Sequence, residues 1–369
     1  MNQRHLMFGL LTVPTIVLIG MGLAFCWATP ANSYYHHCEA YYFNHQFCWL
    51  IIGACVATGG YFLGWRRWLK ATPFVALVWL GLVIYAVTTP CVKGSIGWIS
   101  CGCCRVNVLE FAPVVFALLA AYLVGLVKAK PLMAVLVGVL TFCGAVGHAT
   151  ICHRIRFEIA DLVPSQQIVA KEGEKTAYAF LQNQCVGAVR ESRWFGGCDI
   201  NTRYLPESTT TSMPASSAVI FGKWYLILMA FALASLSLGV GMAFMLNCDR
   251  QMRAYSLIWG VAAIIPAFQN VLGCVGFAPI SEAGVPFACF GGILIVSTLL
   301  GLAILASQAS ECVPDVKVTR KGWVLVSVLV LELVVMTVFG IFSVGMRDQF
   351  EFMGSSARVE SGSSGPSQK

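Results

Sequence analysis

The sequence predicts an all-α, polytopic membrane protein of about nine transmembrane helices with one long extracytoplasmic loop. Of its 369 residues, 58% are hydrophobic and only 11% are charged, whereas charged residues make up about a quarter of an ordinary soluble domain. Mean hydropathy is +0.76. Apolar stretches of about 20 residues, long enough to cross a bilayer as helix, recur along the chain.

The predicted spans follow one another with short loops between most of them. They cover 7–29, 46–65, 72–89, 108–127, 131–152, 218–246, 254–276, 284–307 and 322–345. The first span is interpreted as a retained helix, because its apolar run exceeds the 7 to 15 residues typical of a signal peptide.

Basic residues alternate between loops, and this alternation predicts the orientation. They cluster at Arg4, then at Arg66, Arg67 and Lys70, then at Lys128 and Lys130, then at Arg250 and Arg253, and finally at Lys317, Arg320 and Lys321. Cytoplasmic loops are enriched in Lys and Arg. The amino terminus is therefore predicted to be cytoplasmic, with loops 30–45, 90–107, 153–217 and 277–283 outside. The net charge of +7 is explained mostly by this topology, so no nucleic-acid partner is expected.

The sixteen cysteines divide between predicted loops and spans. Those in outside loops, where disulfides can persist, are Cys38, Cys91, Cys101, Cys103, Cys104, Cys185 and Cys198. Those in or near spans are interpreted as small apolar fillers, among them Cys26, Cys55, Cys143, Cys248 and Cys274. The run CGCC at 101–104 lacks a second ligand pair at zinc spacing, which favours a disulfide or idle thiols over a metal site.

Five segments, each in an outside loop or at the edge of a span, carry a family resemblance. They are HQFCW at 45–49, KGSIGWISCGCCRVNVLE at 93–110, QNQCVGAVRESRWFGG at 182–197, YLPE at 204–207 and NVLGCVGFAPISEAGVPFACFGG at 270–292. In this order they resemble the shape, elongation, division and sporulation (SEDS) proteins, the FtsW/RodA/SpoVE-like glycosyltransferases. The resemblance spans about residues 10 to 308.

The resemblance implies a membrane glycosyltransferase that polymerises a lipid-linked disaccharide, lipid II, in bacterial cell division or shape maintenance. It implies a multi-pass location in the bacterial cytoplasmic (inner) membrane, contact with membrane lipid, and a class B penicillin-binding protein as partner. No cofactor and no protein-held metal site are expected, and a divalent cation stays open as an alternative. In domain terms, 1–308 is the SEDS-like transmembrane domain, 309–353 an extra carboxyl-terminal segment, and 354–369 a disordered tail.

The resemblance also places catalytic positions, and one of them has changed. Where the family has its essential aspartate, in YLPEAHTD, this sequence has Thr211, and a threonine hydroxyl cannot act as a general base near neutral pH. Glu207 is the preferred replacement, with a solvated loop residue or helix cap as the alternative. Glu110 matches a family glutamate, and interaction with a helix amino end explains it equally well.

Six further positions are predicted to bind substrate. Arg193 offers a guanidinium that suits phosphate, and Trp194 and Tyr204 offer rings that stack on sugars or anchor the loop at the interface. Gln184, Asn270 and Pro286 match the family's patterns. Segment 273–292 is rich in Gly and Pro, which predicts either a cavity lining or a tight turn.

Other departures keep two alternatives open. A family lysine is replaced by Pro113, a family arginine by Gly97, and a hairpin present in ten-span relatives is missing. These losses favour a catalytically inactive SEDS homologue that serves as scaffold for a penicillin-binding protein. The second alternative is a membrane transporter or pore, although we find no internal repeat of the kind that transporters carry.

Overall fold

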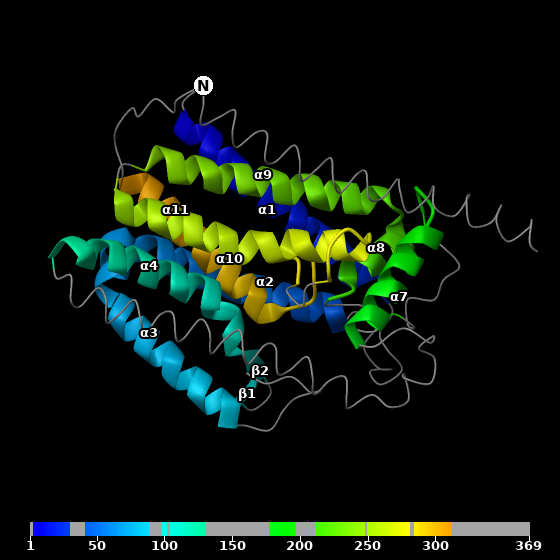
Figure 1. The fold of residues 1–369 in the computed structure, drawn as a ribbon, viewed down its shortest axis with the longest axis horizontal. Helices are drawn as coiled ribbons and strands as arrows, with labels where there is room; N and C mark the ends of the chain where they lie inside the picture. The colour runs from blue at the N-terminus through cyan, green and yellow to red at the C-terminus, as the bar shows by residue number, and fades with distance from the viewer. Residues whose placement is uncertain are drawn as a thin grey trace, which may run out of the picture.

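The computed structural model describes residues 3–29, 41–88, 98–101, 104–129, 177–196, 205, 211–247, 249–280 and 284–311. These residues form a bundle of long helices with a small hairpin at one end (Figure 1). The helices are α1 (Gln3–Ala28), α2 (Tyr41–Leu63), α3 (Trp65–Thr88), α4 (Ala112–Ala129), α7 (Ala177–Glu191), α8 (Met213–Phe221), α9 (Trp224–Leu246), α10 (Arg250–Cys274) and α11 (Gly292–Glu311). The hairpin is β1 (Trp98–Cys101) and β2 (Cys104–Asn107), followed by the 3-10 turn η2 (Val108–Phe111).

Seven helices in the described part of the chain are long and apolar enough to span a membrane. They are α1, α2, α3, α9, α10, α11 and the segment Val108–Val127, which joins η2 to α4. The predicted fold class, a polytopic all-α membrane protein, is confirmed. The predicted spans at 131–152 and 322–345 lie outside the described residues.

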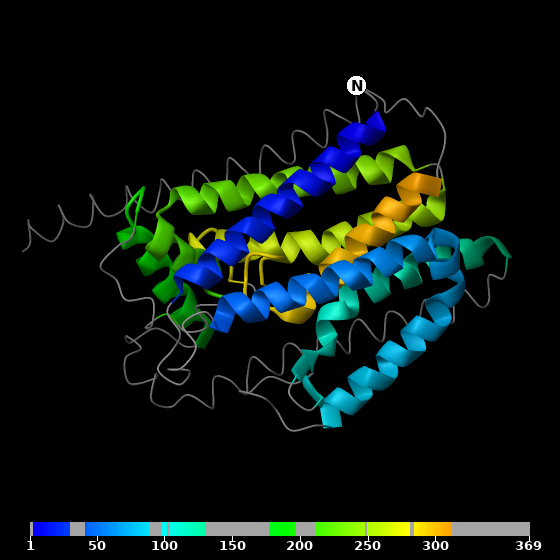
Figure 2. The ribbon, with the colours of Figure 1, turned by 180° about the vertical axis from the view of Figure 1, so that it is seen from behind.

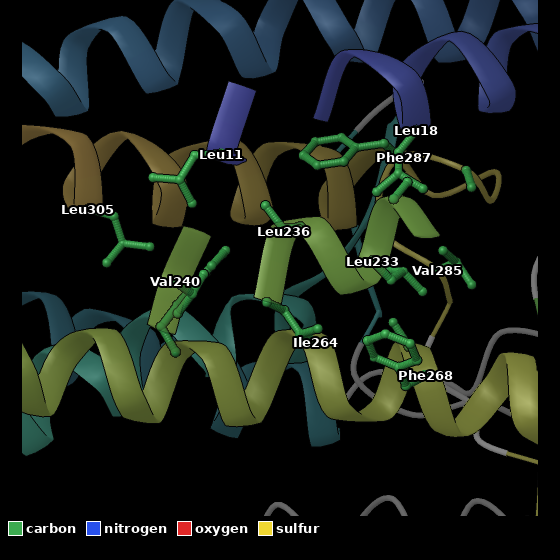
Figure 3. Packing of buried hydrophobic residues seen from close by; sticks show 14 of the residues in the cluster. Leu11, Leu18, Leu233, Leu236, Val240, Ile264, Phe268, Val285, Phe287 and Leu305 are labelled. Carbon is green, nitrogen blue, oxygen red and sulfur yellow. The ribbon is translucent and has the colours of Figure 1, made fainter. Parts of the chain in front are cut away.

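The long helices pack in neighbouring pairs, α1 with α9, α2 with α11 and α4 with α10 (Figure 2). The buried residues between α1, α9, α10 and α11 include Leu18, Leu233, Phe268 and Leu305 (Figure 3). In a membrane such contacts act through close van der Waals packing, because lipid tails are as apolar as these side chains. Large apolar side chains on α2 and α3, such as Phe62 and Phe74, instead project outward, as expected of lipid-facing helices.

The hairpin was predicted only as part of a loop. Its strands are antiparallel, with Trp98 opposite Asn107. Ile99 and Val108 pack with Trp79 of α3, and the Trp79 indole N–H donates to the Val108 carbonyl at 3.0 Å. The alternation of apolar and polar residues in CRVN, at 104–107, was the available signal.

Two predicted span boundaries are wrong. The run 218–246 is two helices, because the backbone at Gly222 (φ 100°, ψ 167°) leaves the helical region between α8 and α9. The run 284–307 becomes helical only at Gly292, since Phe287 adopts a left-handed φ of 66°. Hydropathy detects an apolar run but not a break in its helix.

Candidate functional site

The non-helical segment 284–291 is held by a side chain from α2. Gln46 is 1% exposed, and its amide Nε2 donates to the carbonyls of Phe287, at 3.3 Å, and Cys289, at 3.0 Å. Buried carbonyls outside a helix need such donors. The Gln46 Oε1 atom is buried and has no hydrogen-bond partner among the residues described.

Glu110, in η2, braces the start of α11. The backbone N–H of Leu294 donates to its carboxylate, and Leu294 lies in the first turn of α11, where amides have no partner within the helix and attract negative charge. The other carboxylate oxygen, Oε2, is buried, and no partner for it lies within the described ranges. Glu110 thus interacts with the amino end of a helix far along the chain.

The thiol of Cys289 lies next to this group. Burial, with the nearby Glu110 carboxyl as a second cause, raises the pKa of Cys289. Pro286, predicted to bind substrate, is buried in the same segment. Gln46, Glu110 and Pro286 are therefore gathered around residues 284–292, where the sequence alone placed only Glu110 and Pro286 in the site.

Residues 211–219 form a second region, a strip of hydroxyls inside the protein. Thr211 is 4% exposed, and Ser212, Ser216 and Ser217 are 0% exposed. The Ser217 hydroxyl donates to the Pro214 carbonyl at 2.7 Å, whereas Ser216 Oγ has no partner in the described part of the protein. The position that matches the family's aspartate is therefore packed within the fold and carries a hydroxyl.

The turn after α7 docks on the junction between α8 and α9. The backbone N–H groups of Lys223 and Trp224 donate to the carbonyls of Arg193, at 2.9 Å, and Trp194, at 3.4 Å. The side chains of Arg193 and Trp194 remain exposed. Both predicted substrate-binding side chains therefore stand on a backbone that is fixed.

Lys223 is a cation that the sequence analysis missed. Its Nζ donates to the Arg190 carbonyl at 3.1 Å and lies 5.9 Å from the centre of the Trp194 ring, so it adds positive charge beside the exposed Arg193. The available signal was a lysine within the predicted apolar span 218–246.

The remaining predicted residues are dispersed. Asn270 is fully buried in α10 and accepts a hydrogen bond from the Cys274 thiol at 3.8 Å. Gln184 is exposed on α7. Tyr204 and Glu207 lie outside the described residues.

No group of three or more His, Cys, Asp or Glu side chains able to hold a metal ion occurs within the described residues. The polar groups described at the two candidate regions are amides, hydroxyls, one carboxylate and basic side chains. This set can hold a polar or anionic ligand through hydrogen bonds and charge.

Comparison with solved structures identifies the arrangement of the helices. A chain from a peptidoglycan synthase complex whose structure addresses the coordination of polymerization and crosslinking matches with a TM-score of 0.59 at 15% identity, covering 82% of this chain and 97% of that chain. The chain has the SEDS fold. The rod shape determining protein RodA of Thermus thermophilus matches with a TM-score of 0.52, covering 83% and 97% of the two chains, and an aspartate-to-alanine mutant of it with 0.56, covering 83% and 98%, both at 19% identity.

These identities are low, and the likeness concerns the fold. No protein-family model matches the sequence, and no curated protein matches it. The SEDS resemblance inferred from the five segments is confirmed at the level of the fold.

Proposed function

We propose that this protein works in bacterial peptidoglycan assembly, as a SEDS-type glycosyltransferase-like protein that acts on lipid-linked disaccharide in the cytoplasmic membrane. The observation that carries the proposal is the match of its fold to RodA and to a peptidoglycan synthase chain over nearly their whole lengths. In this proposal the substrate contacts segment 284–292 and the turn at 192–196 that docks on the α8–α9 junction.

The reaction requires a sugar hydroxyl to attack the anomeric carbon of a second sugar while the lipid diphosphate departs. A general base that takes the hydroxyl proton contributes about 10²- to 10⁴-fold. Thr211 cannot supply it, so we assign this role to Glu207, the carboxylate four residues earlier in the sequence. Arg193 and Lys223 would stabilise the negative charge on the diphosphate.

A polymerisation assay with purified protein and lipid-linked disaccharide tests this assignment. The wild-type chain is expected to form glycan, and Glu207→Ala to reduce the rate by at least about 10²-fold. Glu191→Ala is the matched control, because Glu191 is an exposed carboxylate at the end of α7. Equal rates for the two variants would contradict the role of Glu207.

A second candidate function is a non-catalytic scaffold in the same pathway. The observation that favours it is the buried hydroxyl strip, in which Thr211 replaces the family's acid. In this case the wild-type chain makes no glycan under conditions in which a relative with the aspartate does. The chain would instead support polymerisation or crosslinking by a class B penicillin-binding protein.

A partner-binding experiment tests the proposed pathway independently of glycosyltransferase activity. Both candidate functions predict that the chain co-purifies with a class B penicillin-binding protein expressed in the same cells. Failure to bind any such protein, together with absence of glycan synthesis, would contradict both.

A further inference from the structure

Two cysteine thiols meet where α7 contacts the end of α10. Cys185 of α7 and Cys274 of α10 are each 0% exposed, both are thiols in this structure, and their side chains are in hydrogen-bonding contact. The sequence analysis assigned Cys185 to an outside loop and Cys274 to a span, and nothing in their spacing joined them.

The contact belongs to a packed interface. Along α7, Gln182, Cys185, Val186 and Val189 recur at helical spacing and therefore share one face. Gln182 donates to the Ala278 carbonyl at 2.8 Å. Val186 lies 3.4 Å from where a Cβ on Gly276 would stand, and Val189 belongs to the same buried cluster as both cysteines. Contacts on both sides of Cys185 therefore fix its position against Cys274.

Two further contacts hold the sulfur of Cys274 in place. The backbone N–H of Ala215, in the first turn of α8, donates to its sulfur. The Cys274 thiol in turn donates a hydrogen bond to the Asn270 side-chain oxygen at 3.8 Å.

We propose that Cys185 and Cys274 are joined by a disulfide in the mature protein, which fixes α7 to the end of α10. The reaction is thiol–disulfide exchange with an extracytoplasmic disulfide donor. One S–S bond forms here, two protons and two electrons leave these thiols, and the disulfide of the donor is reduced to two thiols. The proposal depends on the predicted outside location of residues 153–217, where a disulfide persists, and it goes beyond the proposed function.

The bond would have a structural consequence at the candidate site. Ala215 touches Cys274 and lies four residues after Thr211. A covalent link between Cys185 and Cys274 would hold α7 close to the first turn of α8, where the hydroxyl strip lies. It also limits how far the turn at 192–196 can move from the α8–α9 junction.

Peptide mapping tests the bond directly. Because both thiols are buried, cells are quenched in acid, and the protein is then denatured and alkylated without reductant. Chymotrypsin cuts after Leu272 and Phe277, and after Leu181 and Trp194, so the two cysteines fall in separate peptides, 273–277 and 182–194, each with one cysteine. The expected product is a pair of these peptides that separates on reduction. Two alkylated peptides, or either cysteine linked to a different one, would overturn the proposal.

Limited trypsin cleavage gives an independent readout on the full chain. Arg193 is exposed and lies between the two cysteines. Trypsin added to intact cells therefore divides the chain into two fragments when it cuts after this residue alone, and only these chains are scored, because a cut before Cys185, as at Lys175, would separate fragments that the bond does not join. On a denaturing gel without reductant the cleaved protein should run at full length, and with reductant as two bands. Cys185→Ser should give two bands in both cases.

Cys48→Ser is the matched control for this assay. Cys48 is an exposed free thiol on α2, and its substitution should leave the gel pattern of the wild type unchanged. Two bands from the cleaved wild-type chain without reductant would overturn the proposed bond, whatever the result of the glycan assay.

Discussion

The segment at 284–292 and the strip at 211–222 differ in how they are held. The first is irregular backbone fixed by distant side chains, with Gln46 donating to carbonyls 241 and 243 residues away. The second is largely helical and bonded within itself, as in the contact from Ser217 to Pro214. Glu110, which contacts Leu294 just after the first region, is a carboxylate, whereas Thr211 in the second region carries a hydroxyl.

This difference shows that a residue can match a family pattern because it supports the fold, independently of any role in a reaction. Gln46 and Glu110 each have a structural role. Gln46 donates to a carbonyl of the irregular segment, and Glu110 accepts from a backbone amide at the start of α11. Thr211 lies in a region whose packing does not depend on a carboxylate. The fold therefore accommodates the loss of the acid without losing the segments around it.

A carboxylate introduced at position 211 should have the largest effect among the substitutions that test the difference between the two regions. In a Glu207→Ala background, Thr211→Asp is expected to raise glycan synthesis by about 10²- to 10⁴-fold, because it returns a general base to the family's position. Thr211→Asn is the control of similar size without the charge. Equal product from the two variants, both eluting as folded protein on gel filtration, would contradict the assignment of position 211.

Breaking the second region at its helix junction gives the next effect. Gly222 has a backbone conformation open almost only to glycine, and a Cβ there would lie 2.6 Å from the Trp194 carbonyl oxygen. Gly222→Ala should lower the free energy of unfolding by about 3 kcal/mol, measured as a lower melting temperature in detergent. Gly187→Ala on α7, with no atom within 4 Å of the added Cβ, should leave it nearly unchanged.

The first region has a matching weak point at Gly22 of α1. A Cβ at this residue would lie 2.0 Å from the Phe287 carbonyl oxygen, so α1 or segment 284–291 must shift. Gly22→Ala should cost about 2 kcal/mol, whereas Gly20→Ala in the same helix meets no atom within 4 Å. If the two variants melt at the same temperature, α1 does not support this segment as the structure indicates.

Glu110 gives the smallest and most specific effect. Glu110→Ala removes the acceptor for the Leu294 N–H and should cost about 1.5 kcal/mol, while Glu110→Gln keeps a carbonyl acceptor and should cost less. Thermal unfolding of the two variants measures the difference. Equal losses for the two variants would show that the charge of Glu110, and not its acceptor oxygen, stabilises the start of α11.

The sequence was sufficient for the helices and insufficient for these contacts. Length and hydropathy predicted each long helix in the described part of the chain, because a span must be continuous and apolar. That Glu110 meets α11, or that Cys185 meets Cys274, depends on which helices become neighbours, and no local pattern encodes this. The burial of Thr211 was also hidden, since a run of Thr and Ser between prolines is typical of an exposed loop.

The break at Gly222 also sets the hydrophobic thickness of the protein. A helix of n residues is about 1.5n Å long, so α9, with 23 residues, is about 34 Å and fits a hydrocarbon layer of about 30 Å with modest tilt. Uninterrupted continuation from α8 would have exceeded that layer and drawn Lys223 into it. Ending one helix there and starting the next relieves the mismatch and leaves the ammonium before the start of α9, where its Nζ donates to the Arg190 carbonyl.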